Sequence, residues 1–439
     1  MLKNKYPIIV SCLLFSFYTL TAQNTEGVRN PNFVGKEVTS DTSKQTLSLE
    51  AVLINIKKNN PQLKMYDADI KSMDVAALGA KSWMPPQVSS GFFMTPYNAR
   101  MWRVNDRNTG MGSFMVGVTQ MIPNPKKLNS EFNYMNAMSS VEIENKNYTI
   151  NQLRALAKTN YYQWLVLQKK LKITNENLML LSYMIQSMEI RYQYNMMKLP
   201  TYYKAKSQYS ALQSMIVMLE NDMSQKRIML NTLMAVDKNR AFDIDSTFTL
   251  LNFETVFPDT TSLLNQRSDI RAIDNTIALN RLKIEVEKVR LLPEFGVRYD
   301  HMFPFGQNPM QFNFMVMANI PMPWSTQMNL ANIGSIQIKN NSLYWQKQMI
   351  LNEASGMISS MNTELQNLKK QYNIVEKSII PALKKNYETA LLAWQNNTGE
   401  LFEVLDAWEA LNMAQIEALD KLQNMLNTQV EIEKQLEIK

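Results

Sequence analysis

The sequence predicts an α+β membrane protein built from two tandem structural repeats. Three observations predict this class: segments about 200 residues apart match each other, four short segments alternate apolar and polar residues, and long segments repeat apolar residues every seven positions. Matching segments at a long separation indicate equivalent structural units. Strict alternation predicts β-strands, and heptad repeats predict coiled-coil helices.

The duplication is visible in matching residues at nearly constant separation. Ile122-Pro123-Asn124-Pro125 returns as Ile320-Pro321-Met322-Pro323, and residues 192–205 return as residues 394–407. Each half has the same order: a helix, a proline, a strand, a loop, a second strand, a proline and a long helical hairpin. The two halves are therefore expected to fold alike.

The first residues have the pattern of a secretory signal. Lys3 and Lys5 precede an apolar run that ends near Ala22, and this run is too short to span a bilayer as a helix. Cleavage after Ala22 removes the only cysteine, Cys12, which excludes disulfides and thiolate metal sites. The expected segments are a signal peptide at 1–22, an extended arm at 23–46, a first repeat at 47–235, an equatorial linker at 236–265, a second repeat at 266–430 and a tail at 431–439.

Four segments read as strands, at 87–97, 111–122, 294–303 and 311–320. In the third, Phe295, Val297 and Tyr299 alternate with polar residues and glycine. Strands of about ten residues with this alternation are typical of transmembrane β-strands, although a soluble hairpin with one buried face has the same pattern. No later stretch has 18 consecutive apolar residues, which is the length that indicates a membrane helix.

The predicted helical hairpins at 130–235 and 328–430 favour the membrane interpretation. The first rising helix spans roughly 60 residues, or about 90 Å, and Trp164, Leu171 and Leu178 mark its heptads. Pro381 predicts a kink in the second. Four strands cannot close a barrel, because the smallest membrane barrels have eight, and open edges in lipid are prohibitive. Membrane-bound strands must therefore be pooled by several copies, and three copies supply twelve.

Composition argues against other classes of function. The net charge of +7 is spread along the predicted helices, which indicates solvated faces rather than a nucleic-acid site. His301 is the single histidine, and the sequence has no zinc-protease, phosphate-loop or dinucleotide motif. We therefore expect no enzyme activity, no cofactor and no nucleic-acid partner.

Several motifs, in order and duplicated, resemble the TolC family of outer-membrane efflux proteins over essentially the whole mature chain. They are Leu49-Glu50-Ala51-Val52, Asn59-Asn60-Pro61-Gln62-Leu63, Val118-Thr119-Gln120-Met121-Ile122-Pro123, Arg267-Ser268-Asp269-Ile270-Arg271-Ala272, Leu291-Leu292-Pro293, and Tyr387 to Ala407 with Gly399 at the helical turn. One departure is the first turn, where Asn195-Met196-Met197-Lys198 replaces the family's usual glycine.

The resemblance implies a homotrimer whose twelve-stranded β-barrel, four strands per chain, continues into an α-helical tunnel across the periplasm. It implies an outer-membrane channel of a tripartite efflux system, with a periplasmic membrane-fusion adaptor, an inner-membrane pump of the RND type and outer-membrane lipid as partners. A duct of a type I protein-secretion system and a periplasmic coiled-coil adaptor are the alternatives. Substrate, pump, adaptor and resting state are not predicted.

The turns of the hairpins are the predicted gate and adaptor-docking tip. Lys198 aligns with Glu400, and Lys204 aligns with Asp406. If equivalent hairpins alternate around a ring, ion pairs such as Lys204–Asp406 would hold the aperture closed; ordinary solvated charge is the alternative. The tip residues are Asn195, Lys198, Lys204, Gly399, Glu400 and Asp406.

Methionine is abundant, at 32 residues, and dense around the predicted strands. Alternation places Met115, Met315 and Met317 on the inward face. Thioethers are soft ligands that suit Cu(I) or Ag(I), so these residues suggest a heavy-metal branch of the family and copper or silver as cargo. Flexible packing by methionine is the alternative.

Overall fold

The computed structural model describes residues 46–438 except 103, 106–107, 195–198, 246, 249, 251–259 and 397. The chain divides into two units, Met1–Ser43 and Lys44–Lys439, and every described element belongs to the second. The predicted signal peptide at 1–22 and all but the last residue of the predicted arm at 23–46 lie outside the described residues.

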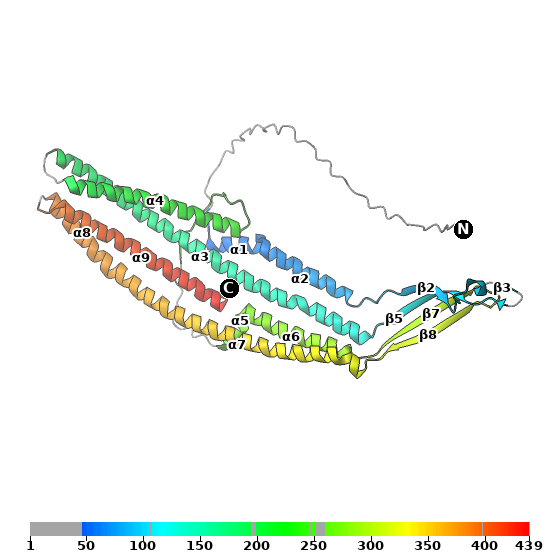
Figure 1. Cartoon of the computed structure of the whole chain (residues 1–439). Coiled ribbons are helices and arrows are strands. Elements are labelled where there is room, and N and C mark those ends of the chain that lie inside the picture. Colours follow the sequence, from blue (N-terminus) through cyan, green and yellow to red (C-terminus); the bar gives the residue numbers. More distant parts are fainter. Residues whose placement is uncertain are drawn as a thin grey trace, which may run out of the picture. The chain divides into compact units, whose positions relative to one another are not determined.

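Both halves of the chain place two long strands between helices, β2 and β5 in the first half and β7 and β8 in the second (Figure 1). The first half contains β1 Thr46–Leu47, α1 Leu49–Asn59, α2 Pro61–Gly79, β2 Gln87–Phe93, η1 Ala99–Trp102, β3 Val104–Asn105, β4 Asn108–Thr109, β5 Ser113–Ile122, α3 Pro125–Gln193 and α4 Leu199–Leu233. The second contains β6 Asp243–Ile244, α5 Thr260–Gln266, α6 Ser268–Val289, β7 Glu294–Pro304, β8 Gln311–Asn319, α7 Pro323–Ile374, the π-helix η2 Val375–Ile379, α8 Ile380–Gln395 and α9 Leu401–Leu436.

The helices that follow the strands begin at prolines, five residues before the predicted starts at 130 and 328. Pro125 and Pro323 occupy the first turns of α3 and α7, where the missing N–H of proline costs nothing and its fixed φ suits the helix. Asn124 caps α3, since its Oδ1 accepts a hydrogen bond from Lys126 N at 3.0 Å. At the other end of the chain, α9 runs to Leu436, so most of the segment predicted as a tail at 431–439 is helical.

The four strands β2, β5, β7 and β8 form one antiparallel sheet in that spatial order. Strands of the first half thus pair directly with those of the second, through β5 and β7. Gly117 pairs with Asp300, which in turn pairs with Asn313. This register fixes which residues of separate strands share a face, because side chains alternate along each strand.

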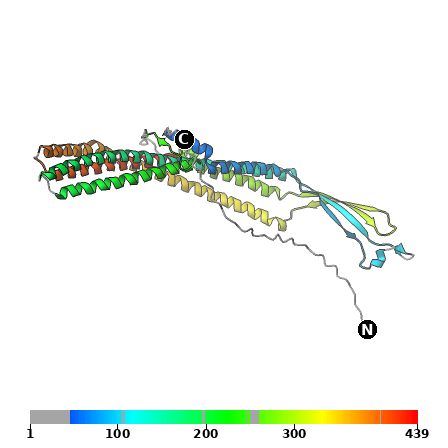
Figure 2. The same cartoon turned by 90° about the horizontal axis from the view of Figure 1, so that it is seen from above.

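The helical part is organised around α3, which has 69 residues and extends roughly 100 Å. It packs against α2, α4, α6 and α9. Figures 1 and 2 both place the α3–α4 and α8–α9 turns together at one end and the sheet at the other. The π-helix Val375–Ile379 ends two residues before Pro381, where the sequence predicts a kink. None of the described helices has an apolar stretch long enough to cross a membrane.

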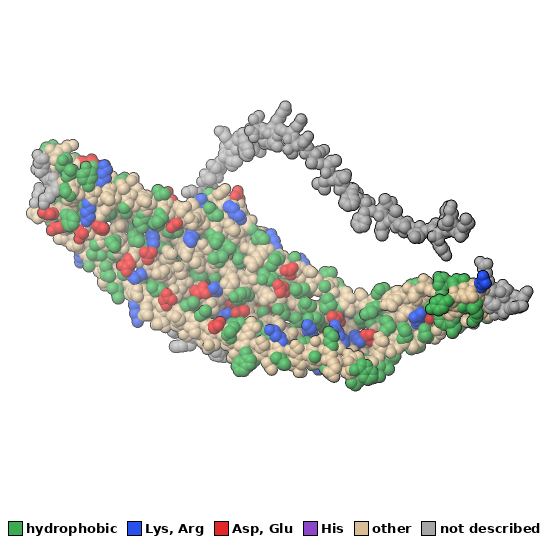
Figure 3. Space-filling model, in the orientation of Figure 1, with side chains coloured by type: hydrophobic (Ala, Val, Ile, Leu, Met, Phe, Trp, Pro, Cys, Tyr) green, Lys and Arg blue, Asp and Glu red, His purple; other side chains and the backbone are tan. Residues whose placement is uncertain are grey.

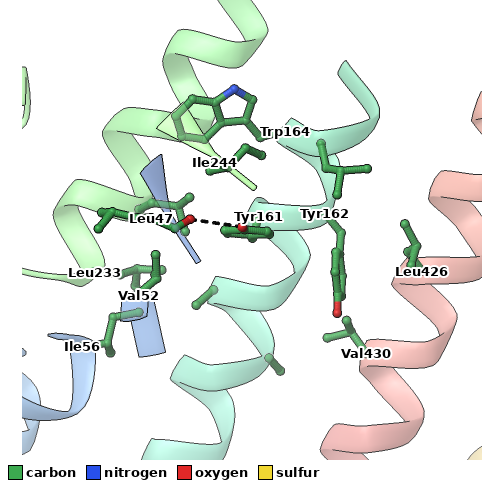
Figure 4. Close-up of a cluster of buried hydrophobic side chains, with 14 of the residues drawn as sticks. Leu47, Val52, Ile56, Tyr161, Tyr162, Trp164, Leu233, Ile244, Leu426 and Val430 are labelled. Carbon is green, nitrogen blue, oxygen red and sulfur yellow. Dashed lines mark hydrogen bonds between the residues drawn. The ribbon is translucent and has the colours of Figure 1, made fainter. Parts of the chain in front are cut away.

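One buried cluster lies at mid-length of α3, where β1 and β6 pair in parallel (Figure 4). The hydroxyl of Tyr161 donates to Leu47 O at 3.1 Å and accepts from Asp245 N at 3.0 Å. It therefore ties the starts of α1 and of the segment after β6 to α3. Burial raises the pKa of Tyr161 to about 12.

The C-terminal end of α9 is fastened to the first turn of α6 by the motif at 267–272. Glu437 accepts hydrogen bonds from Ser268 N at 3.0 Å and from Ser268 Oγ at 2.6 Å, which satisfies donors that the helix itself leaves unpaired. Arg267 pairs with Asp269 at 2.6 Å and donates to Gln435 O. Burial raises the pKa of Glu437, and the Ser268 hydrogen bonds oppose that shift.

Candidate functional site

The sheet has two chemically different faces, which the register assigns residue by residue. The apolar face carries Val88, Ser90 and Phe92 of β2, Phe114, Val116, Val118, Gln120 and Ile122 of β5, Phe295, Val297, Tyr299, His301 and Phe303 of β7, and Phe312, Phe314, Val316 and Ala318 of β8. Phe312 is 70% exposed and Val316 69% exposed. Hydrophobic side chains gather over the far end of the sheet in Figure 3. An exposed apolar face of this extent marks a surface that contacts another protein or a membrane.

The opposite face is mostly polar, apart from methionine, Phe93 of β2 and Pro304 of β7. It carries Gln87, Ser89, Gly91 and Phe93 of β2, Ser113, Met115, Gly117, Thr119 and Met121 of β5, Glu294, Gly296, Arg298, Asp300, Met302 and Pro304 of β7, and Gln311, Asn313, Met315, Met317 and Asn319 of β8. Met115, Met315 and Met317, which are predicted to face inward, share this face. Met121 and Met302 lie there too. Alternation within β5 and β7 also places them on this face, so the sequence pattern alone could have identified them.

Methionine is therefore segregated on the sheet. Five methionines of β5, β7 and β8 lie on the polar face, and none of the residues on the apolar face of these described strands is methionine. A thioether side chain chosen for hydrophobicity alone would favour the apolar face. Thioether sulfur is a soft metal ligand, and methionine also fills irregular gaps between side chains.

The charges of the polar face are paired. Arg298 Nε donates to both oxygens of Asp300, at 2.9 and 3.0 Å, and Asp300 is 2% exposed. The carboxylate occupies space left by Gly117, where an added β-carbon would lie 2.1 Å from Asp300 Oδ1. Lys127 and Glu294 pair at 2.7 Å where the sheet meets the helices. These two pairs leave little net charge on the face.

At the helical turns, Gly399 closes the α8–α9 connection. Thr398 N and Gly399 N both donate to Ala393 O, at 2.8 and 3.1 Å. An added β-carbon at Gly399 would lie 2.9 Å from Ala393 Cβ, so a side chain would force the turn apart. Glu400 follows as the exposed N-cap of α9 without a side-chain capping bond. Asn195 and Lys198 of the first turn lie outside the described residues.

Lys204 of α4 lies beside α9 of the same chain. Its Nζ is 4.0 Å from Asp406 Oδ1, 3.6 Å from Glu409 Oε2 and 4.5 Å from the centre of the Phe402 ring. The predicted partners are therefore close, within one chain, and Glu409 and Phe402 are additional contacts that the alignment of the halves did not reveal. Each long, exposed ion pair contributes about 0–1 kcal/mol.

Behind the tip, a buried polar contact joins the two hairpins. Trp408 Nε1 donates to Asn177 Oδ1 at 2.8 Å, and Asn177 Nδ2 donates to Asn412 Oδ1 at 3.0 Å. The heptad pattern of α3 predicts an apolar seam in this stretch and does not reveal this contact. A buried asparagine in such a seam fixes the register of the helices, so these three residues set how α3 and α9 align.

The described residues contain no group of three or more His, Cys, Asp or Glu side chains placed to hold a metal ion. His301 lies on the apolar face, and its ring meets Phe303 edge-on with the ring centres 4.6 Å apart. The single histidine therefore packs against a neighbouring ring. Sulfur of methionine is the remaining soft donor on the sheet.

Comparison with known proteins places this arrangement in a known fold. Residues 52–236 match the family model described as outer membrane efflux protein. No curated protein sequence matches the chain. Among solved structures, the chain is similar to CusC, with a TM-score of 0.71, 14% identity, and coverage of 88% of this chain and 91% of that one.

Two further solved structures agree. The outer membrane protein VceC of Vibrio cholerae has a TM-score of 0.70 at 14% identity, covering 88% of this chain and 95% of that one. The CmeC outer membrane channel of Campylobacter jejuni has a TM-score of 0.68 at 14% identity, covering 88% and 85%. At such identities the likeness shows the fold. The fold class and the family resemblance predicted from the sequence are confirmed.

Proposed function

We propose that this chain, an outer membrane efflux protein by the match of residues 52–236 and by its fold, is the channel of a tripartite efflux system. Its location is the outer membrane, with the helical part in the periplasm. In this role it passively conducts solutes that an inner-membrane pump delivers through a periplasmic adaptor. The conducting path needs no catalytic step.

The observation that carries the proposal is the open sheet. β2 and β8 each pair on one side only within the described chain, and the face they share is apolar and exposed. In lipid, an unpaired strand edge leaves backbone donors and acceptors unsatisfied. Pairing β2 of one copy with β8 of the next removes both edges, and three copies then close a twelve-stranded barrel with the polar face inside.

Purification from the outer-membrane fraction tests this function. Native mass spectrometry is expected to give the mass of a trimer, and the protein is expected to form ion-conducting channels in planar bilayers. Recovery as a monomer from the soluble periplasm would refute the channel and favour the alternative of a periplasmic coiled-coil adaptor. A duct for type I protein secretion shares every feature described above, so co-purification of the inner-membrane partner distinguishes it from a solute efflux channel.

The cargo that the polar face fits best is a soft monovalent metal cation, Cu(I) or Ag(I). The support is the segregation of methionine onto the face that would line the barrel, because thioether sulfur prefers soft cations. A deletion strain is expected to lose copper and silver tolerance more than drug tolerance. Equal loss of both, or loss of drug tolerance alone, would contradict this cargo.

The contacts of Lys204 support a role for the tip in gating. They join α4 of the first hairpin to α9 of the second near both turns, and relative movement of the two hairpins would widen or narrow the aperture. We propose that Lys204, Asp406 and Glu409 bias the aperture toward its closed state until an adaptor docks at the turns around Asn195, Lys198, Gly399 and Glu400.

A further inference from the structure

A row of three residues crosses the sheet near the end where the strands meet the helices. Met121 of β5 pairs with Gly296 of β7, and Gly296 pairs with Met317 of β8. All three lie on the polar face. Gly296 is the third residue of β7, directly after α6 and the connection that follows it, so the row lies at the helical end of the sheet.

Both methionine side chains reach the space over the glycine. A β-carbon added at Gly296 would lie 2.6 Å from Met121 Sδ and 3.4 Å from Met317 Cε. These two atoms are therefore no more than 6.0 Å apart, the sum of the two distances. Any other residue at position 296 would put a side chain between the thioethers, and so the glycine is what brings them together.

The charges nearest to this row do not oppose a cation there. Arg298 is the next residue of β7 on the same face, but its guanidinium donates to Asp300, two residues further along the strand and away from Gly296. On the other side, Glu294 is paired with Lys127 at 2.7 Å. The surroundings of the thioethers are thus close to electrically neutral.

We propose that Met121 and Met317 form a two-sulfur binding site for Cu(I) or Ag(I) at the entrance of the barrel. This inference rests on the proposed function, and it assigns the cargo's first binding site in the sheet. Two neutral thioethers bind a soft cation weakly and reversibly, and a conducting path needs sites that are easy to enter and to leave. Three copies of the site would surround one entrance.

The chemistry of the donors sets the selectivity. Thioether sulfur is a poor ligand for Mg²⁺, Ca²⁺ and Zn²⁺, which prefer carboxylate, carbonyl or imidazole groups. His301, the one imidazole in the sequence, lies on the opposite face of β7. The site is therefore expected not to bind zinc at concentrations at which it binds silver.

The test uses the full-length trimer carrying ¹³C-methyl methionine, titrated with silver nitrate in chloride-free buffer and followed by methyl NMR. The methyl resonances of Met121 and Met317, identified by Met121→Leu and Met317→Leu, are expected to shift together and to saturate. Each substitution should abolish the shift of the other methionine. Met115→Leu, on the same face of β5, is the matched control and should leave both shifts intact. Gly296→Ala should weaken both.

Three results would overturn the site: no shift at either methionine, a Met317 shift that survives Met121→Leu, or equal shifts at all methionines of the polar face. Potassium chloride conductance of the same trimers separates this failure from that of the proposed function. Trimers that conduct but do not bind silver refute only the metal site. Trimers that bind silver but never conduct refute the channel.

Discussion

The contacts of Lys204 allow the proposed gate to be tested quantitatively. Lys204→Glu replaces two weak attractions, to Asp406 and Glu409, with repulsions, and it removes the cation from the Phe402 ring. Exposed ion pairs contribute about 0–1 kcal/mol, and an exposed cation–π contact contributes about 0.5–1 kcal/mol. We therefore take the loss of closed-state stability to be about 1 kcal/mol per chain.

A trimer whose three tips open together would lose about 3 kcal/mol of closed-state stability, which changes the closed-to-open ratio on the order of 100-fold. Single-channel recording of purified trimers in planar bilayers measures this ratio directly. Lys206→Glu is the matched control, because Lys206 is exposed on the same helix and has no ion pair with α9 among the described contacts. It makes the same change of charge two residues away.

The expected result is a large rise in open probability for Lys204→Glu and little change for Lys206→Glu. Adding Asp406→Lys to Lys204→Glu should restore part of the closed population, because the pair is then rebuilt with reversed charges. An open probability for Lys204→Glu that equals both the unmodified protein and the control would refute the gate. Equal rises in both variants would show that net charge, rather than this contact, controls opening.

Two further predictions concern stability. Tyr161→Phe should lower the free energy of unfolding by about 1–3 kcal/mol below pH 9, because a buried hydrogen-bonding hydroxyl is lost. The pKa of Tyr161 is raised to about 12 in the folded state. The stabilising effect of its hydroxyl is therefore full below the unfolded pKa and is lost as pH rises through 12. Thermal melting of both proteins between pH 7 and 11.5 should show the difference in stability shrinking above pH 10, and a constant difference would contradict this. Gly117→Val should lower the melting temperature sharply, because its β-carbon would lie 2.1 Å from Asp300 Oδ1 and breaking a buried ion pair costs about 3–5 kcal/mol. The control Gly91→Val should change the melting temperature little, because an added β-carbon there has no atom within 4 Å. Equal effects of the two substitutions would refute the role given to Gly117.

The strands and hairpins follow from local patterns in the sequence. Phe295, Val297 and Tyr299 alternate with small or polar residues, and that alternation is enough to identify a strand and its two faces. The strand edges and helix starts were less accurate. The predicted start at 130 lies five residues after Pro125, where α3 begins, because proline at the first helical position is favourable.

Contacts that depend on register or on tertiary packing were only partly predictable. The alignment of the halves paired Lys204 with Asp406, but no local pattern shows that α4 and α9 of one chain lie side by side, or that Glu409 shares the lysine. Met121 and Met317 flank Gly296 only because β5, β7 and β8 pair in one register. The predictions for Asn195 and Lys198 remain predictions, since both lie outside the described residues.

In the proposed function, the sheet spans the outer membrane with lipid on one face and water on the other. Neighbouring positions of β8 test it most directly, because the mature chain predicted from the sequence has no cysteine. In outer-membrane preparations, a membrane-impermeant maleimide should label Asn313→Cys and Met315→Cys, on the polar face, and should fail to label Phe312→Cys and Phe314→Cys until the protein is denatured. Equal labelling of all four native variants would contradict the claim.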